Sequence, residues 1–448
     1  MLVEPTAPVE ASPRRILGLA LPALGVLAAE PLYLLFDAAV VGRLGALPLA
    51  GLAVGGLVLT QVSTQLTFLS YGTTARAARM HGAGREKDAV GEGVQATWLA
   101  VALGVAIVAV MQLLAAPILS VIGGGGEIAE EATAWFRIAV FGVPFILISM
   151  AGNGWMRGVQ NTRRPLRFVV FGLLVSGVLC PMLVHGLLGF PRLELLGSAV
   201  ANLVGQSIAG CLFIAAISRA GVPLRPRWSV MRVQLILGRD LVLRSLAFQA
   251  CFLSAAAVAS RFGAAAVAAN QVVLLLWNLV SLTLDSLAIA AQTLVGAALG
   301  KGDVRGATKL GWRLTAWSTM FAIVLAAVFA AGMPVIPELF TTDPAVVVQM
   351  HSIWWIFVAI IPIAGIVFAL DGVLLGSGDA AFLRTATLVC ALLGFLPFIW
   401  LSLALDWGLA GIWVGLGVFV SLRAIAVVLR TLSGRWALAG ADIQRDAG

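Results

Sequence analysis

The chain has 448 residues, of which 60% are hydrophobic and only 11% are charged, and its mean hydropathy is +1.02. A soluble domain is closer to half apolar and one quarter charged, so this composition excludes an ordinary soluble protein and indicates a membrane protein with many spans. The net charge of +8 does not by itself indicate a nucleic-acid partner, because membrane proteins collect Lys and Arg in their cytoplasmic loops.

The N-terminal segment MLVEPTAPVEASPRR contains acidic residues and three prolines, and it has no short apolar core followed by a cleavage site. It does not resemble a signal peptide, so we expect the first apolar run to be retained.

A transmembrane helix needs about 20 mainly apolar residues. Runs of this kind predict twelve spans, at about 16–41, 49–75, 94–118, 134–156, 166–190, 195–218, 241–262, 266–297, 311–336, 350–375, 381–404 and 408–430.

The basic residues support this count. If the N-terminus is cytoplasmic, 25 of the 29 Lys and Arg residues fall on the cytoplasmic side. The other side receives only Arg43, Arg137, Arg192 and Arg261. One missed span would remove this bias, which is the bias that the positive-inside rule describes. We therefore expect a multi-pass protein of the inner (plasma) membrane with both termini in the cytoplasm, in contact with membrane lipid and without a nucleic-acid partner.

The two halves of the chain resemble each other at an offset of 218 residues. RLGA at 43–46 recurs as RFGA at 261–264, and Gly154 falls on Gly372. Six spans per half is an even number, so the halves keep one orientation and are expected to be related by a pseudo-two-fold axis along the membrane normal. We expect an all-α integral membrane fold of twelve transmembrane helices in two pseudo-symmetric six-helix bundles, which rock against each other to give alternating access. The expected parts are an N-terminal tail at 1–15, an N-lobe at 16–218, a linker at 219–238, a C-lobe at 239–435 and a C-terminal tail at 436–448.

Four stretches of the sequence together point to one family. They are FDAAVVGRLG in the first span, RGVQNTRRPL after the fourth, RFGAAAVAANQVVLLLWNLVSLTLDSLAIAAQTLVGAALGKGD across the eighth, and FALDGVLLGSGD at the end of the tenth. In this order they resemble the multidrug and toxic compound extrusion (MATE) family, and within it the DNA-damage-inducible (DinF-like) branch. The resemblance covers essentially the whole chain. It implies the MATE fold and an antiporter that expels small organic compounds, driven by entry of H⁺ or Na⁺. We expect no cofactor and a monomer.

Two carboxylates, Glu30 and Asp37, lie inside the first apolar run. Seven residues are about two helical turns, so the two side chains share a helix face, and Pro31 can bend the helix beside them. Either both acids are fixed in polar contacts with neighbouring helices, or they form a proton switch, because a carboxylate that loses water favours its neutral form. We favour the switch, with Asp37 as the main protonation site and Glu30 as its partner. In the family resemblance, Asp37 matches the aspartate linked to ion coupling.

A polar stripe runs along the eighth span, where side chains of one face recur every seven residues. At the offset of 218 the four positions of this stripe fall on Ala53 and three threonines in the second span. Either both stripes line the walls of one substrate cavity, or their polar groups hold helices together. The charge of Asp285 favours a function at that position, as the acid of the second lobe. The stripes consist of Gln271, Asn278, Asp285 and Gln292, and of Thr60, Thr67 and Thr74.

Three further polar residues are assigned to the substrate cavity. Asp371 matches an acidic position of the family, but it lies near the basic interface and can instead pair with an arginine such as Arg384. Asn153 is the repeat partner of Asp371. Asn202 in the sixth span offers an oxygen atom.

The fifth span bears on the identity of the coupling ion. In some family members this span supplies an asparagine and a carboxylate to an ion site, and the matching positions here are Ser176 and Cys180. A thiol is a poor ligand for a hard cation, which prefers oxygen. The resemblance therefore favours H⁺ over Na⁺, and we expect no metal site.

Other functions fit the sequence less well. GAALGKGD has the wrong spacing for an ATP-binding loop and lacks its Ser or Thr, and three scattered histidines do not supply an enzyme active site. A Na⁺-coupled antiporter, an organic-anion exporter and a lipid-linked flippase of the same superfamily stay open as alternatives. Lys and Arg are almost absent from mid-membrane positions, which favours cationic or neutral substrates. We therefore predict a secondary active antiporter, not an enzyme, that exports amphiphilic drugs and toxins in exchange for H⁺.

Overall fold

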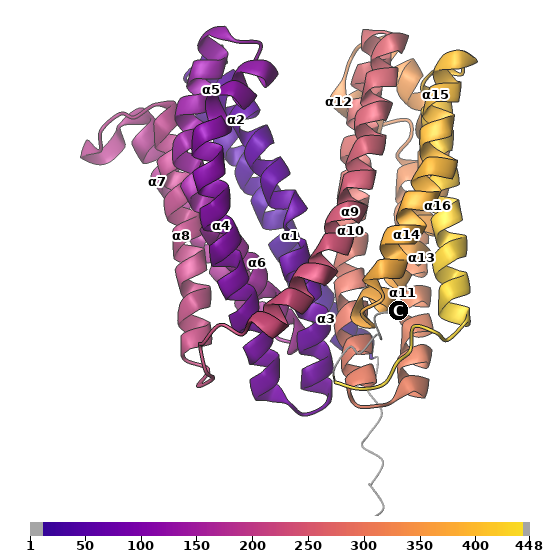
Figure 1. The fold of residues 1–448 in the computed structure, drawn as a ribbon. Helices are drawn as coiled ribbons and strands as arrows, with labels where there is room; N and C mark the ends of the chain where they lie inside the picture. The colour runs from indigo at the N-terminus through magenta and orange to yellow at the C-terminus, as the bar shows by residue number, and fades with distance from the viewer. Residues whose placement is uncertain (1–11, 442–448) are drawn as a thin grey trace, which may run out of the picture. The chain divides into compact units, whose positions relative to one another are not determined.

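The computed structural model describes residues 12–441, and within this range all regular elements are helical. Twelve helical segments in this part of the chain are long and apolar enough to cross a membrane, which confirms the predicted number. They are α1 (Pro13–Gly42), α2 with α3 (Ala46–Gly82), α4 (Glu86–Ile122), α5 with α6 (Gly126–Gly158), α7 (Arg163–His185), α8 (Leu195–Ser218), α9 with a short 3₁₀ turn (Trp228–Phe262), α10 (Ala264–Gly300), α11 (Val304–Ala331), α13 (Pro344–Gly376), α14 with α15 (Ala380–Ala404) and α16 (Gly408–Leu432) (Figure 1).

Several spans contain an irregular turn. In the second span, α2 (Ala46–Gln65) and α3 (Phe68–Gly82) meet at Leu66 and Thr67, whose amides bond to the carbonyl three residues earlier. In the fourth, a 3₁₀ turn at 140–142 joins α5 (Gly126–Ala139) to α6 (Val143–Gly158). In the eleventh, a π-helical turn at 391–395 joins α14 (Ala380–Cys390) to α15 (Leu396–Ala404). The short helix α12 (Ile336–Phe340) lies between the ninth and tenth spans.

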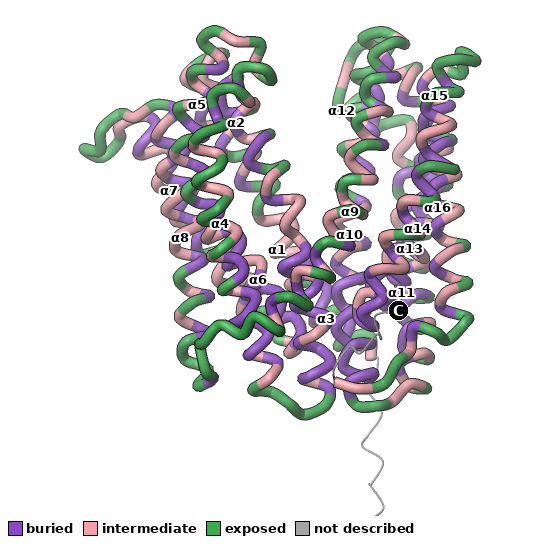
Figure 2. Tube along the Cα trace, viewed as in Figure 1, coloured by how far each residue is buried: buried purple, intermediate pink, exposed green. Residues whose placement is uncertain are grey.

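The chain forms two compact units. One comprises Leu21–Gly238, and the other comprises residues 12–20 together with residues 239–441. We call them the N-terminal unit and the C-terminal unit. Both boundaries between the units fall inside long helices, α1 and α9, and not in loops. In each unit the purple segments of Figure 2 are the buried faces of the helices.

The internal repeat is visible in the packing of the two units. Gly154 of α6 packs on α3, where an added Cβ would lie 2.6 Å from the carbonyl oxygen of Ser70. Gly372 of α13 packs on α10 in the same way, against the carbonyl of Ala288. Both partners of the second contact lie 218 residues after those of the first, as the sequence repeat predicts. The close approach of the backbones explains why each position holds a glycine.

Two spans were predicted to end later than their helices do. The fifth span was expected to reach residue 190, but α7 ends at His185 because Gly186 takes the left-handed conformation (φ +71°). The ninth was expected to reach residue 336, but α11 ends at Ala331 and the chain turns at Gly332. In both cases the apolar run continues beyond the helix, so hydropathy alone did not mark the end.

The expected linker at 219–238 is only partly a connecting segment. Helix α9 (Trp228–Ala259) begins inside it, so that only 219–227 lies outside regular structure. The proline-containing sequence VPLRPRW delays the start of the helix, because a proline disfavours the helical conformation in the residue before it.

The ends of the expected lobes also differ. Trp436, expected in the C-terminal tail, is 1% exposed and donates its indole N–H to the carbonyl of Thr431 at 2.9 Å. It packs in one apolar cluster with Ile16 and Leu19 of α1, which were expected in the N-lobe, and with residues of α10 and α11. The first turns of α1 therefore belong to the C-terminal unit.

Candidate functional site

The N-terminal unit contains a cavity of about 310 Å³. It is enclosed by α1, α2, α3, α6, α7 and α8. Its apolar wall includes Val26, Met150 and Leu173, and polar side chains line the rest. An apolar cavity of this size with a few polar groups suits a small organic ligand.

Four of the predicted site residues line this cavity: Glu30, Thr60, Thr67 and Asn153. Glu30 is exposed and lies beside Pro31 in α1. Thr67 stands at the turn between α2 and α3, and its hydroxyl bonds to the carbonyl of Thr64 at 2.9 Å. The cavity therefore combines one carboxylate with hydroxyl and amide groups.

Helix α6 presents a polar stripe to the same cavity. Ser149, Asn153 and Arg157 follow at intervals of four residues, which places them on one face. The hydroxyl oxygen of Ser149 and the amide oxygen of Asn153 are buried and make no hydrogen bond within the described chain. Arg157 is 3% exposed, and its Nη1 donates to Ser70 Oγ at 3.4 Å. Buried polar groups usually find a partner, so the two unused oxygens suit a bound ligand or water.

Asp37 lies elsewhere in the N-terminal unit, in a closed polar cluster. Its side chain is 0% exposed. Oδ1 accepts from the Cys180 thiol of α7 at 3.2 Å, and Oδ2 accepts from the Ser198 hydroxyl of α8 at 2.8 Å. Among the described residues Asp37 has no cationic partner. A thiol and a hydroxyl therefore hold this buried carboxylate without charge compensation.

The donors in this cluster can be assigned because a hydroxyl carries one hydrogen. Ser198 donates its hydrogen to Asp37, so at its contact with Trp135 Nε1, 3.2 Å away, it accepts. Beside it, Ser176 Oγ lies 2.8 Å from the carbonyl of Ala201 and 2.7 Å from the Tyr33 hydroxyl. It donates to the carbonyl, so Tyr33 donates to it. Helix α1 is thus tied to α7 through Tyr33, one turn before Asp37.

Glu30 and Asp37 do not form a pair. Seven residues separate them by about 10 Å along the helix axis, and they share no hydrogen-bond partner. Glu30 lines the cavity, whereas Asp37 is enclosed by α7 and α8. The common helix face was predicted from spacing, but α1 meets different neighbours at the two positions.

Two other predicted residues of this unit lie outside the cavity lining. The hydroxyl of Thr74 is buried between backbone carbonyls, 2.8 Å from that of Ser70 and 3.0 Å from that of Gly154. These contacts fit the alternative that polar residues hold helices together. Asn202 is buried in α8, next to Ala201.

In the C-terminal unit the predicted stripe on α10 changes character along its length. Gln271 and Asn278 are exposed, Asp285 is half-buried and Gln292 is 1% exposed. The backbone carbonyl of Gln292 lies against Gly376 of α13. The stripe therefore runs from an open surface into a helix–helix contact, so its members do not share one environment.

Asp371 is held by two arginines rather than by Arg384. Its Oδ2 accepts from Arg244 of α9 and from Arg423 of α16. Both guanidinium groups also lie over the ring of Phe248, at 5.7 and 5.2 Å from its centre. Asp371 lies in a buried ion pair in which two cations share one carboxylate, which fits the alternative that it pairs with arginine, although with different arginines from the one expected.

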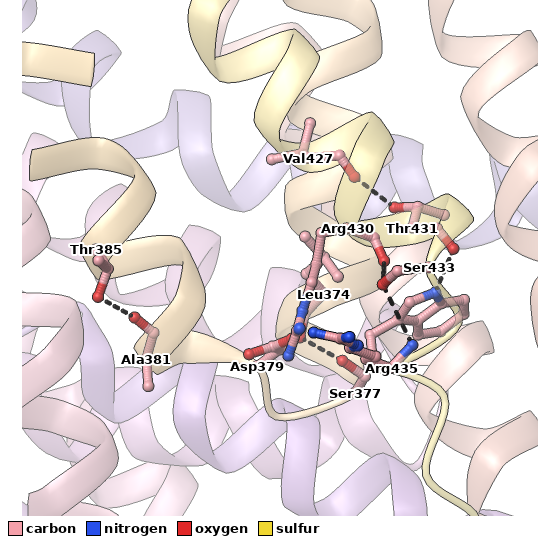
Figure 3. A network of polar contacts seen from close by, with 11 residues as sticks. Leu374, Ser377, Asp379, Ala381, Thr385, Val427, Arg430, Thr431, Ser433 and Arg435 are labelled. Carbon is pink, nitrogen blue, oxygen red and sulfur yellow. Dashed lines mark hydrogen bonds and ion pairs between the residues drawn. The ribbon is translucent and has the colours of Figure 1, made fainter. Parts of the chain in front are cut away.

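Arg384 pairs with a different acid. Its Nη1 donates to Asp240 at 2.6 Å. Asp379 stands at the start of α14, and its carboxylate accepts from Arg430 of α16 at 2.7 Å (Figure 3). Asp240, Asp371 and Asp379 are thus each engaged by an arginine of a neighbouring helix.

Sequence reasoning missed several residues of both sites. Tyr33 lies four positions before Asp37, and helical spacing could have linked them. Ser198 lies in the sixth span, where a serine in an apolar run gave no signal of its own. Trp135 had no recognisable signal, because an indole in an apolar run is ordinary core. Arg157 was counted only as a cytoplasmic charge.

Comparison with known proteins gives a consistent result. The MatE family model matches residues 22–182 and 241–400, two ranges that follow the internal repeat and together cover more than half of the chain. The chain is 30% identical over 444 residues to Protein DETOXIFICATION 44, chloroplastic, of Arabidopsis thaliana, covering 94% of this chain and 83% of that protein. It is 30% identical over 427 residues to the DNA damage-inducible protein F of Escherichia coli (strain K12), covering 91% and 90%.

A further relative is a probable multidrug resistance protein NorM of Thermotoga maritima, 26% identical over 441 residues, which cover 94% of this chain and 93% of that protein. Among solved structures, the chain resembles a MATE protein in a bent conformation with a TM-score of 0.86 at 22% identity, covering 94% of each chain. It also resembles an outward-facing multidrug resistance MATE transporter with a TM-score of 0.81, covering 94% and 95%. These matches confirm the predicted fold.

Proposed function

Because the chain belongs to the MATE family of multidrug and toxin efflux transporters, we propose that it is a secondary active antiporter that exports amphiphilic organic compounds in exchange for H⁺. It is a multi-pass membrane protein, and its family consists of transporters rather than enzymes. The alternating-access mechanism, the coupling ion and the substrate class belong to the proposal.

The observation that carries the proposal is the closed cluster around Asp37. A carboxylate that is fully buried without a cation is costly, so proton exchange at this position changes the local free energy strongly. The repeat position in the second half is Ala255, so the N-terminal unit alone carries this acid. Asp37 is therefore the proposed proton site.

Protonation of Asp37 would reverse one of the two hydrogen bonds that hold this side chain of α1. The carboxylate form accepts from Cys180 and Ser198. A protonated carboxyl group donates through the oxygen that carries the proton and still accepts at the other; with the proton on Oδ2, Ser198 would need a new acceptor for its own hydrogen. On the other side the proton would meet the Cys180 sulfur, which is a weak acceptor. Proton binding would thus loosen the ties of α1 to α7 and α8, which links the charge of one residue to the position of a helix.

The donor set of the cluster favours H⁺ over Na⁺. A hard cation needs several oxygen ligands, whereas Asp37 has a thiol at Oδ1 and a hydroxyl that already donates to Oδ2. Both Asp37 oxygens are occupied by hydrogen-bond donors, which a cation would have to displace. A proton needs no such ligand shell.

The cavity supports the proposed substrate class. Its aliphatic wall suits the apolar part of an amphiphile, and Glu30 suits a cationic or hydrogen-bond-donating group. Arg157 in the same lining is the observation that favours the second candidate, an organic-anion exporter. Glu30, Thr60, Thr67 and Asn153 are the proposed substrate contacts; Asp285, Gln271 and Asn278 are proposed for the C-terminal unit.

The proposed location is the inner membrane with both termini cytoplasmic. Support comes from the bias of Lys and Arg, which leaves only four of 29 on the opposite side. We further propose that the protein acts as a monomer.

Transport by the purified protein in liposomes tests the proposal. We expect a pH gradient to drive accumulation of a fluorescent organic cation such as ethidium, and a Na⁺ gradient at constant pH to have no effect. Accumulation driven by Na⁺ alone would contradict the ion assignment. Accumulation of an organic anion but not of ethidium would favour the second candidate.

A further inference from the structure

The segment Arg219–Gly238, which we call the strap, leaves α8 and crosses the N-terminal unit before α9 becomes a membrane span. Residues 219–227 have no regular structure, and the first turns of α9 follow. Figure 1 shows this part of the chain passing obliquely over α4 and towards α3, instead of running along them.

Side chains of α4 fix the irregular part of the strap. Gln95 is 0% exposed, and its amide donates to the carbonyl of Arg225 at 3.0 Å and accepts from the amide of Arg227 at 2.6 Å. Trp98 donates its indole N–H to the carbonyl of Leu224 at 2.7 Å. The backbone of the strap is therefore held in one place by specific contacts.

The helical part is fixed in the same way. Gln234 donates to the carbonyl of Glu92 at 3.1 Å and to its carboxylate at 2.9 Å. Glu92 is in turn held by the guanidinium of Arg76 at 2.7 and 2.6 Å. Gly238 packs on the ring of Phe68 in α3. One face of the strap thus packs on the N-terminal unit, and the opposite face is exposed.

The contacts on α4 locate the strap relative to the membrane. Glu92, Gln95 and Trp98 bracket the point near residue 94 where the apolar run of this span begins. This is the border between water and hydrocarbon, on the side where the basic residues of the chain collect.

The outward face of the strap suits such a border. Trp228 is 66% exposed, Ile236 is 47% and Leu224 is 44%. Basic residues alternate with them, and the strap contains no acidic residue. All four basic residues are exposed: Arg219, Arg225, Arg227 and Arg232. Exposed tryptophan and aliphatic side chains interleaved with arginines are typical of an interfacial segment on an anionic leaflet.

We infer that the strap is a binding surface for the anionic headgroups of phospholipids in the leaflet on its side of the membrane. The arginine guanidinium groups bind the phosphates, and Trp228 and Ile236 sit among the upper acyl groups. Charge complementarity identifies the lipid class, because zwitterionic headgroups carry no net charge to attract four arginines. The inference concerns lipid recognition only, and it holds whichever ion drives transport.

Native mass spectrometry of the purified full-length protein, exposed to equal amounts of dioleoyl phosphatidylglycerol and dioleoyl phosphatidylcholine, tests this surface. The wild-type protein is expected to retain phosphatidylglycerol preferentially. The combined variant Arg225→Gln, Arg227→Gln and Arg232→Gln is expected to bind phosphatidylglycerol about a hundredfold more weakly, with phosphatidylcholine binding unchanged. The matched control is the combined variant Lys301→Gln, Arg305→Gln and Lys309→Gln, which removes three exposed charges of the C-terminal unit. It is expected to keep the preference for phosphatidylglycerol.

An unchanged preference in the strap variant would overturn the inference, as would an equal loss in the control, which would indicate net charge instead of a site. A second measurement needs no charge-removing variant. Brominated phosphatidylglycerol is expected to quench the tryptophan fluorescence of the wild-type protein more than that of Trp228→Phe. If brominated phosphatidylglycerol quenches both proteins equally, Trp228 does not contact this lipid and the inference is wrong.

Discussion

At the residue scale, two buried aspartates with similar sequence signals have opposite surroundings. Asp37 accepts hydrogen bonds from neutral donors, whereas Asp371 accepts from two guanidinium groups. A carboxylate beside neutral donors can gain a proton without leaving an unpaired charge. A carboxylate shared by two arginines cannot, because its neutralisation leaves both cations buried. The two residues therefore suit different roles, exchange at Asp37 and structure at Asp371.

Replacement of Asp37 by Asn removes the group that exchanges a proton and keeps the shape of the side chain. The amide fills the same volume but does not titrate, so we expect Asp37→Asn to fold normally and to lose transport driven by a pH gradient. Uptake of ethidium into proteoliposomes at imposed pH gradients measures this. Glu338→Gln, at an exposed position, is the control and is expected to transport like the wild type. Wild-type rates with an unchanged pH profile in Asp37→Asn would rule out Asp37 as the coupling site.

Replacement of Asp371 by Asn is expected to act on stability. It leaves Arg244 and Arg423 without their shared anion; the loss of one partner of a buried ion pair costs about 3–5 kcal/mol. Thermal unfolding of the purified protein in detergent measures the change. Asp37→Asn serves as the matched comparison, since it breaks no ion pair within the described chain. An equal melting temperature for Asp371→Asn and the wild type would show that the pair contributes little.

At the scale of the helices, glycines set how closely the elements approach. The contact of α6 with α3 and that of α13 with α10 are built from equivalent residues in the two halves. The strong packing of α13 on α10 and α11 makes it the central helix of the C-terminal unit. Close backbone contact of this kind is a main source of helix association inside a membrane, where burial of apolar groups gives no advantage over lipid.

A methyl group at these glycines is expected to separate the helices. Gly372→Ala would drive a Cβ into the carbonyl of Ala288, and we expect a loss of about 1–3 kcal/mol of stability. Gly56→Ala is the control, because an added Cβ there meets no atom within 4 Å. Melting temperatures of the two variants should differ clearly. A Gly372→Ala protein as stable as Gly56→Ala would mean that α13 can shift without cost.

At the scale of the whole molecule, the units are joined through helices instead of through loops alone. Helix α1 begins among apolar residues of the C-terminal unit and carries Asp37 in the N-terminal unit. Helix α9 begins as part of the strap and continues into the C-terminal unit. A change in the hydrogen bonds of α1 with α7 and α8 therefore acts on a helix that belongs to both units.

The proposed topology makes a prediction for the intact cell. A cysteine introduced at Arg192 is expected to react with a membrane-impermeant maleimide from outside, and one at Arg225 only after permeabilisation, because the two positions lie at opposite ends of the spans. Both side chains are exposed, so accessibility of the protein surface does not limit either reaction. The test uses a background in which Cys211, the exposed native cysteine, is replaced by Ser. The reverse pattern would invert the topology.

The sequence by itself determined the fold. The twelve spans could be predicted from hydropathy, because the bilayer requires apolar helices long enough to cross it. The bias of basic residues and the repeat of RLGA as RFGA can be read directly from the sequence. Asp37 could also be identified, since a carboxylate in an apolar run is exceptional whatever surrounds it. The tertiary structure decided what sequence spacing could not. It separated Glu30 from Asp37, brought Cys180 and Ser198 to Asp37 from α7 and α8, and paired Asp371 with Arg244 and Arg423. These outcomes depend on which helices pack together and in which rotation, and contacts between residues 52 to 161 positions apart leave no periodic signal along one chain.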